Sequence, residues 1–330
     1  MLNNFVKYCL DREGHIRTLL VPAQDMINPS LMNPSIIKVD NEILVNLRNV
    51  NYILYHAEKN LNEHAWGPLC YLHPENEIQL ATHNIICTLD KNYNVASHCN
   101  IDTSKLDVKP LWEFIGLEDC RLVRWDNKLY VCGVRRDTTP NGQGRMELSE
   151  IVKENNIYKE INRARIPAPP NDKSYCEKNW MPILDKPYHF VKWTNETEVV
   201  KYDPVNKTCE TVLIKKYKDL GTGDLRGGSQ VIKFGNYYLA LVHETLLYKS
   251  EAGRKDATYY HRFVVWNEDF DIIKVSPLFN FMNGKIEFSC GMIIENDQFL
   301  ITFGFQDNAS YLLGVSVKTI EDFIFNECTS

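Results

Sequence analysis

Residues 121–134 read R-L-V-R-W-D-N-K-L-Y-V-C-G-V, which is two apolar runs joined by Asp126-Asn127. Val, Leu, Tyr and Trp favour strands, and an Asp-Asn pair tolerates the positive φ angles that a two-residue hairpin turn needs. We therefore predict that residues 121–125 and 128–134 form strands that pair as a β-hairpin.

Four further stretches repeat this pattern of two short strands about a polar turn. They are residues 35–47 about Asp40-Asn41, 181–193 about Asp185-Lys186-Pro187, 229–242 about Gly235-Asn236, and 291–303 about Glu295-Asn296-Asp297. Helical periodicity is scarce and is confined to a short polar stretch near residues 146–154 and the tail at residues 319–326. The sequence therefore predicts an all-β fold with few short helices.

The repetition of the hairpin unit indicates how the sheets are arranged. Five units spaced roughly 50 to 85 residues apart favour radial repetition, in which each sheet is one blade around a central channel. We predict a single five-bladed β-propeller domain over residues 1–330, with an N-terminal segment at 1–30 and a short C-terminal helix and tail at 318–330. An irregular β-sandwich is the alternative, because it accommodates the same strands.

The composition is that of a soluble globular chain of 330 residues, 44% hydrophobic and 24% charged. Its net charge is −6, so the basic field that attracts nucleic acid is missing. No apolar run reaches the roughly 20 residues that span a bilayer. The N-terminus carries Lys7, Asp11, Arg12 and Glu13 where a signal peptide is apolar. We expect a cytoplasmic protein with no nucleic-acid partner and no membrane span.

Cysteine and histidine patterns give no sign of a disulfide framework or a metal centre. The ten cysteines are spread from Cys9 to Cys328 without a C-x-x-C pair, which favours free and mostly buried thiols. The nine histidines are scattered, and no H-E-x-x-H motif occurs. Neither a G-x-G-x-x-G fingerprint nor a Walker A motif is present. We expect no metal and no cofactor.

A propeller would bring distant residues together at one end of its axis. The innermost strand of each blade lines the channel, so the residues before it and those that end the next strand emerge at the same mouth. The segments before the five hairpins are 33–35, 118–121, 178–180, 226–229 and 288–291. Charged or polar residues that end the second strands are Arg48, Arg135, Arg136, Lys192, His243, Glu244, Gln306 and Asp307. We expect these residues to converge.

The expected mouth combines carboxylates, cations and amides with nearby aromatic rings such as Trp180. This mixture suits a carbohydrate, because sugar rings stack on flat apolar faces while polar groups bind their hydroxyls. Candidate sugar-binding residues are Asn33, Glu118, Asn179, Trp180 and Asp307. Candidate anion-binding residues are Arg48, Arg135, Arg136, Lys178, Arg226 and His243.

Glycosyl transfer requires paired carboxylates, and Asp119 and Asp307 are the pair that we select. Burial and the neighbouring Glu118 are expected to raise the pKa of Asp119 towards neutrality, while Arg121 opposes them. Each of these two carboxylates also has a structural alternative. Asp119 can be an acid that ties its loop to Arg121, and Asp307 can be an ordinary turn residue.

The motifs also resemble those of a known family. Residues 116–121, G-L-E-D-C-R, resemble the G-x-E-D-P-R signature of the five-bladed β-propeller β-mannoside phosphorylases and hydrolases and of the related β-1,2-mannosyltransferases. Residues 177–179 resemble that family's E-K-N motif, residues 241–243 its Y-H-G motif, and residues 303–307 its Y-G-A-A-D motif. Cys120, Gln306 and Glu244 depart from the motifs, where the family has Pro, Ala and Gly.

The resemblance implies an inverting glycosyltransferase or glycoside phosphorylase that acts on mannose. In the family the residue matching Asp119 is the general acid, acting through a sugar hydroxyl, and the residue matching Asp307 contacts the innermost sugar. His243, with Arg135 or Arg136 and Lys178, is the implied phosphate site. The implied partners are mannose 1-phosphate or GDP-mannose and an oligosaccharide acceptor. Two alternatives are a β-mannoside hydrolase, with Glu244 as base, and a non-catalytic sugar-binding propeller.

Overall fold

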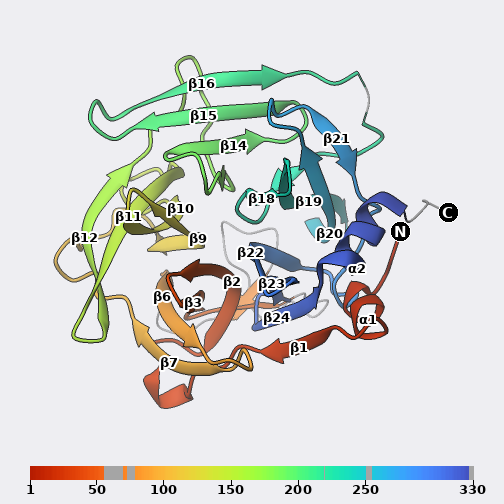
Figure 1. The fold of residues 1–330 in the computed structure, drawn as a ribbon. Helices are drawn as coiled ribbons and strands as arrows, with labels where there is room; N and C mark the ends of the chain where they lie inside the picture. The colour runs from red at the N-terminus through yellow and green to blue at the C-terminus, as the bar shows by residue number, and fades with distance from the viewer. Residues whose placement is uncertain (56–69, 73–78, 219, 250–254, 327–330) are drawn as a thin grey trace.

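The computed structural model describes residues 1–55, 70–72, 79–218, 220–249 and 255–326. Five sheets of four or five strands are arranged around a central axis, as Figure 1 shows. The innermost strand of each sheet lies nearest this axis and the last strand lies at the periphery. The predicted five-bladed β-propeller is therefore confirmed, and the β-sandwich alternative is excluded.

The blades follow one another along the chain. Blade 1 contains β2 (Ser30–Val39), β3 (Glu42–Val50), β6 (Leu80–Leu89) and β7 (Val95–Asn100), with β8 (Phe114–Ile115) beside β6. Blade 2 contains β9 (Leu117–Trp125), β10 (Lys128–Arg135), β11 (Arg145–Glu154) and β12 (Ile157–Arg165). Blade 3 contains β13 (Met181–Pro182), β14 (His189–Trp193), β15 (Thr197–Asp203) and β16 (Thr208–Lys215).

The last two blades complete the ring. Blade 4 contains β17 (Arg226–Gly227), β18 (Ile232–Phe234), β19 (Tyr237–Lys249), β20 (Lys255–Trp266) and β21 (Ile272–Val275). Blade 5 contains β22 (Glu287–Glu295), β23 (Gln298–Phe305), β24 (Ala309–Ser316) and β1 (His15–Thr18). A separate two-stranded sheet pairs β4 (Ile53–Tyr55) with β5 (Cys70–Leu72).

The N-terminal segment closes the ring, because β1 pairs antiparallel with β24 as the outermost strand of blade 5. Helix α1 (Phe5–Leu10) precedes it, and the Phe5 ring packs 4.3 Å from that of Phe279. Within the N-terminal segment at residues 1–30, the stretch His15–Thr18 is thus the outermost strand of the last blade. A four-residue strand carries too little pattern for the sequence to show its partner.

The helices are short. The predicted tail helix is present as α2 (Val317–Glu321) and η2 (Asp322–Asn326), and it begins earlier than predicted because Ser316 accepts a hydrogen bond from the Thr319 amide. The helix predicted near residues 146–154 is wrong, since these residues form β11, which pairs with both β10 and β12. A 3-10 turn, η1, spans Ala23–Asp25. Among the described residues no helix is long and apolar enough to cross a membrane.

The five predicted hairpins are present, with local differences in strand length. Asp126 and Asn127 have φ angles of 50° and 61°, which are the values that a two-residue type I′ turn requires. In blade 3 the innermost strand is reduced to Met181–Pro182, and in blade 4 it is divided into β17 and β18. These interruptions lie close to the axis.

Neighbouring blades stack through large apolar side chains. Trp125, Trp180 and Phe190 pack between blades 2 and 3, and Phe281 and Phe303 stack at 4.1 Å between blades 4 and 5. Because each blade buries its faces against two neighbours, the five innermost strands are held around one axis.

Bulged backbone marks the start of the innermost strands. Asn33, Asp119 and Asn179 have φ angles of 46°, 50° and 61°, and β2 and β9 each lose register with their partner strand beside these residues. Gly133 accommodates the bulge of blade 2, because a Cβ at this position would lie 2.3 Å from the Glu118 carbonyl oxygen. Bulges redirect side chains, and left-handed non-glycine residues are frequent at functional sites.

Candidate active site

A polar cavity of about 160 Å³ lies at the axis, where the hairpins were expected to converge. All five blades, or the segments just before them, contribute to its wall. The predicted site residues that line it are Asn33, Arg48, Glu118, Asp119, Lys178, Asn179, His243 and Asp307. We call this cavity the axial pocket.

Asp119 is held by residues of blade 1. Its Oδ1 accepts hydrogen bonds from Arg48 Nη1 and Asn33 Nδ2, both at 2.8 Å. Burial alone would raise the pKa of Asp119, but Arg48 and Asn33 lower it to about 2. The expectation that the pKa of Asp119 is raised is therefore wrong, and this carboxyl group is ionised at neutral pH.

Asp307 has a different environment in the same pocket. It lies in the turn after β23, with a φ angle of 48°, and forms no ion pair with any residue that the structure describes. Gln306 fixes this turn, because its amide donates to the Ile286 carbonyl at 2.6 Å and its Oε1 accepts from the Ile286 amide at 2.8 Å. Burial and the nearby Asp119 carboxylate raise the pKa of Asp307 to about 6. Asp307 therefore carries a proton far more readily than Asp119.

Arg48 links these carboxylates to the surrounding strands. Its side chain is 6% exposed, and Nη2 lies 3.3 Å from Glu118 Oε2 and donates to Tyr52 Oη at 2.5 Å. Its Nε donates to Thr82 Oγ1 at 3.3 Å. Burial raises the pKa of Glu118, although Arg48 opposes this effect. Arg48 lines the pocket but is paired with two carboxylates of the protein, and its expected role in binding an anion stays a prediction.

His243 contributes a neutral polar group. Its ring stacks on Tyr259 at 5.0 Å and meets the edge of Phe288 at 5.0 Å. Burial lowers the pKa of His243 well below the ordinary value, and His261 and Arg226 act in the same direction. A neutral imidazole binds by hydrogen bonding rather than by charge, so the geometry gives His243 no cationic role towards phosphate.

Three buried polar atoms of the pocket residues have no hydrogen-bond partner among the described residues. They are Asn33 Oδ1, Asn179 Oδ1 and His243 Nδ1. Buried polar atoms are nearly always paired in folded proteins, so unpaired atoms around one cavity point to a bound molecule. The donors and acceptors of a sugar fit these atoms.

Lys178 is the exposed cation of the pocket wall. It makes no ion pair with the part of the chain that the structure describes, and its charge acts on Glu118, Asp119 and Asp307. It can therefore meet an anionic group at the mouth of the pocket.

The structure places Trp180 away from the pocket. Its side chain is 1% exposed, its ring packs against Phe190 in the core, and its Nε1 donates to Glu177 Oε2 at 2.8 Å. The expectation that Trp180 stacks on a sugar is wrong, because the Trp180 ring is buried in the core between blades 2 and 3 while the preceding residue, Asn179, lines the pocket.

Three of the expected anion-binding arginines also lie outside the pocket wall. Arg135 lines a different cavity, and its Nε lies 2.9 Å from Glu147 Oε2. Arg136 donates a hydrogen bond to the Gly142 carbonyl at 3.0 Å and lies over the Phe114 ring. Arg226 pairs with Asp224 at 3.2 Å. Each of these arginines has a partner within the protein, and none of them lines the axial pocket.

Glu244, the expected base of a hydrolase, is occupied as well. Its carboxylate accepts hydrogen bonds from Arg262 Nε and from the Gly223 amide, and it does not line the pocket. Within the described ranges no group of three or more His, Cys, Asp or Glu residues is arranged to hold a metal ion.

The pocket also has an apolar side that was not predicted from the sequence, formed by Tyr52, Phe114, Ile286 and Phe288. Two of these residues have positions in the sequence from which their place in the pocket could have been predicted. Tyr52 follows Arg48 by four residues, and Phe288 begins the segment that precedes the fifth hairpin. Ile286 had no such pattern, because its position depends on the long-range contact with Gln306.

Solved structures of other proteins resemble this fold. No family model matches the chain, and no curated protein matches its sequence. A β-1,2-mannobiose phosphorylase from Listeria innocua, solved in complex with β-1,2-mannobiose, superposes with a TM-score of 0.54 at 15% identity, covering 95% of this chain and 100% of that one. This chain shares its fold.

Two further solved structures agree. A glycosyl hydrolase from Bacteroides ovatus gives a TM-score of 0.59 at 12% identity, over 88% of this chain and 85% of the other. A mannose phosphorylase from Leishmania mexicana, in complex with a phosphate ion, gives a TM-score of 0.53 at 9% identity, over 98% of this chain and 95% of the other. The likeness runs through nearly the whole propeller, which confirms the resemblance in fold.

Proposed function

We propose that this protein is a carbohydrate-active enzyme that transfers a glycosyl unit, most simply mannosyl, by single displacement with inversion. The observation that carries the proposal is the carboxylate pair of the axial pocket, with Asp119 at a pKa of about 2 and Asp307 at about 6. Carboxylates whose environments separate their pKa values in one cavity are typical of acid–base chemistry. The mannose-active and glycoside-active proteins that share the fold support the substrate class.

The two carboxylates take different roles in this proposal. Asp307 donates a proton to the glycosidic oxygen during cleavage, and takes a proton from the acceptor hydroxyl during synthesis. Asp119 stays ionised and faces the positive charge that develops on the sugar ring. This assignment exchanges the roles that the motif resemblance implies, because Arg48 and Asn33 keep Asp119 deprotonated.

The charges around the pocket favour a hydroxyl acceptor over inorganic phosphate. His243 is neutral, and Arg135, Arg136 and Arg226 are engaged elsewhere. Lys178 alone among the described cations of the wall is free, and one lysine suits the phosphate of a donor such as mannose 1-phosphate or GDP-mannose. A sugar hydroxyl is then the acceptor, and water takes its place in the hydrolase alternative.

Mass spectrometry of products tests the proposal. The protein is incubated with mannose 1-phosphate, GDP-mannose and mannobioses, with and without phosphate. We expect donor-dependent product, and a fall of roughly 10²- to 10⁴-fold in turnover in the Asp119→Asn and Asp307→Asn variants, each assayed at a temperature at which circular dichroism shows that the variant is folded. Asp297→Asn, in an exposed turn of blade 5, is the matched control and keeps full activity.

Undiminished turnover in both pocket variants would refute the carboxylate roles. If saturable sugar binding occurs without any product from the whole panel, the non-catalytic sugar-binding propeller is the correct description.

A further inference from the structure

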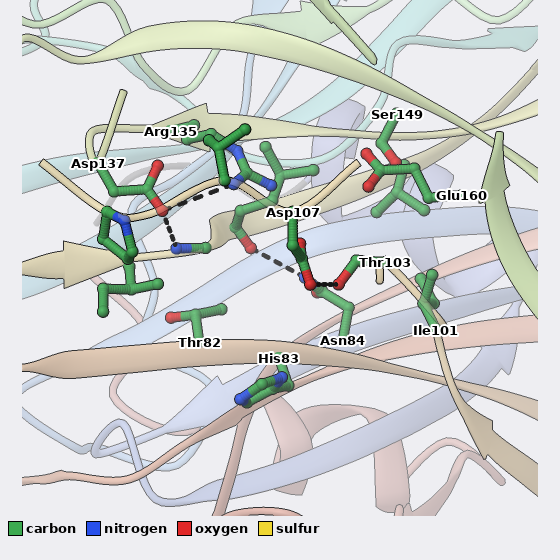
Figure 2. Close-up of a pocket in the computed structure, with 16 residues that line it drawn as sticks. Thr82, His83, Asn84, Ile101, Thr103, Asp107, Arg135, Asp137, Ser149 and Glu160 are labelled. Atoms are coloured by element: carbon green, nitrogen blue, oxygen red, sulfur yellow. Dashed lines mark hydrogen bonds and ion pairs between the residues drawn. The ribbon is translucent and has the colours of Figure 1, made fainter. Parts of the chain in front are cut away.

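A second cavity, of about 290 Å³, lies between blades 1 and 2 (Figure 2). Thr82 and His83 of β6 form one side, and Arg135 of β10 and Asp137 form the other. Residues 101–111, which we call the covering segment, supply a further part of its wall. Its volume is at the lower end of small-molecule pockets, which are roughly 300 to 1,000 Å³. We call it the interblade cavity.

The covering segment is fixed in place by both chain and side-chain contacts. The Asp102 amide donates to the Tyr158 carbonyl at 2.8 Å, and the Leu111 amide donates to the Asp137 carbonyl at 2.8 Å. Arg163 Nη1 donates to the Leu106 carbonyl at 3.1 Å. The cavity is therefore formed before any molecule enters it.

The guanidinium groups around the interblade cavity are already paired. Arg135 Nε lies 2.9 Å from Glu147 Oε2, and Nη1 lies 3.5 Å from Asp137 Oδ2. Arg165 Nη1 is 3.1 Å from Glu147 Oε1, and Arg163 Nε donates to Glu160 Oε1 at 2.9 Å. Asp107 adds another carboxylate to the wall, so negatively charged side chains outnumber positively charged ones among these groups. Binding of an anion in this cavity is therefore unfavourable.

One carboxylate oxygen in the wall is left without a hydrogen-bond donor by the part of the chain that the structure describes. The Asp137 side chain is 6% exposed, and its Oδ2 accepts a hydrogen bond from the Gly116 amide at 3.0 Å. Its Oδ1 is buried and has no hydrogen-bond donor among the described residues. Leaving such an oxygen unpaired is unfavourable, so a donor from a bound molecule fits the site.

Neutral hydrogen-bonding groups and aliphatic surface complete the wall. Thr103 and Ser149 add hydroxyls, and burial lowers the pKa of His83, which leaves a neutral imidazole that can donate or accept. Ile101 and Ile115 present apolar surface. Carboxylate and hydroxyl acceptors beside aliphatic carbon match the hydroxyls and C–H groups of a sugar.

We propose that the interblade cavity is a second sugar-binding site, which takes a neutral, hydroxyl-rich molecule of monosaccharide size. Its wall adjoins the axial pocket, since Gly116 and Leu117 line the interblade cavity and the next residues, Glu118 and Asp119, line the axial pocket. The proposal does not depend on catalysis in the axial pocket.

Hydrogen–deuterium exchange of the full chain, measured with increasing D-mannose, tests the site because it locates binding along the sequence. We expect saturable protection of the covering segment, weakened about tenfold by Asp137→Asn, since a lost hydrogen bond to a charged group costs about that factor. Ser149→Val is a second variant that leaves the Gly116 contact intact. Asp307→Asn, in the axial pocket, leaves this protection unchanged.

Three results would overturn the proposal. They are the absence of saturable protection in the covering segment, equal protection in the wild type and both variants, and equal protection by inorganic phosphate, which would show that charge rather than hydroxyl recognition decides binding.

Discussion

Arg48 Nη1 lies 2.8 Å from Asp119 Oδ1, so a cation at the end of the second strand of blade 1 holds the carboxylate that begins blade 2. The same guanidinium lies 3.3 Å from Glu118. Because Arg48 is almost fully buried, this contact both joins the two blades and sets the charge of the axial pocket.

Removing Arg48 should destabilise the fold. In Arg48→Met the Glu118 and Asp119 carboxylates lose their buried cation, and we expect the free energy of unfolding to fall by about 3–5 kcal/mol. Urea denaturation measures this loss. Arg124→Met is the matched control, because Arg124 pairs with Asp40 at 2.7 Å on the surface, where such a pair contributes about 1 kcal/mol or less. Equal losses in the two variants would contradict the role given to Arg48.

The stability of the fold should depend on pH through Asp307. Its pKa is raised from 3.8 to about 6, so the folded state binds this proton more tightly than the unfolded state. The resulting stabilisation is complete below the unfolded pKa and disappears as the pH rises through about 6, a change of about 3 kcal/mol.

Asp307→Asn should abolish this part of the pH dependence. Urea midpoints measured between about pH 4 and pH 7 will fall less steeply in Asp307→Asn than in the wild type. Asp297→Asn, in an exposed turn of the same blade, should behave like the wild type. If Asp307→Asn retains the full slope, another group is responsible.

Gln230 should be important for holding the blades together. This fully buried side chain of blade 4 donates through Nε2 to the carbonyls of Ile36 and Leu122, both at 2.9 Å, and accepts from the Met292 amide at 3.3 Å. It therefore bridges blades 1, 2 and 5 near the axis.

Gln230→Leu leaves these backbone groups buried and unpaired, and we expect it to lower the free energy of unfolding by about 3 kcal/mol or more. Differential scanning calorimetry measures the stability of this variant. Gln24→Leu, which replaces an exposed glutamine, is the control. A change in Gln230→Leu no larger than in Gln24→Leu would show that the bridge is dispensable.

Local sequence patterns predicted the hairpins well because each depends on a few adjacent residues. Asp126-Asn127 adopts the predicted turn, and the strands on either side follow it. The same reasoning failed where pairing partners are distant. Residues 145–154 have helix-forming Met and Glu side chains but pair with strands on both sides, and β1 is defined by β24 at the other end of the chain.

The candidate site divides in a similar way. The order of the hairpins placed Asn33, Asp119, Asn179 and Asp307 at one end of the axis, because the side chains that flank each innermost strand have few other places to go. It did not separate Arg48, which faces the pocket, from Arg135, which faces the interblade cavity. That choice depends on bulges and on acidic partners from other strands.

The amino-acid sequence by itself determined the strands, their turns, the five-fold repetition and the kinds of residue that meet at the axis. Only the tertiary structure decided which of the two carboxyl groups binds a proton more tightly. The pKa of Asp119 is lowered because Arg48 and Asn33 contact it, and the pKa of Asp307 is raised because burial and the charge of Asp119 act on it. These partners are remote in sequence, and a pKa depends on burial and on charges within a few ångströms in space.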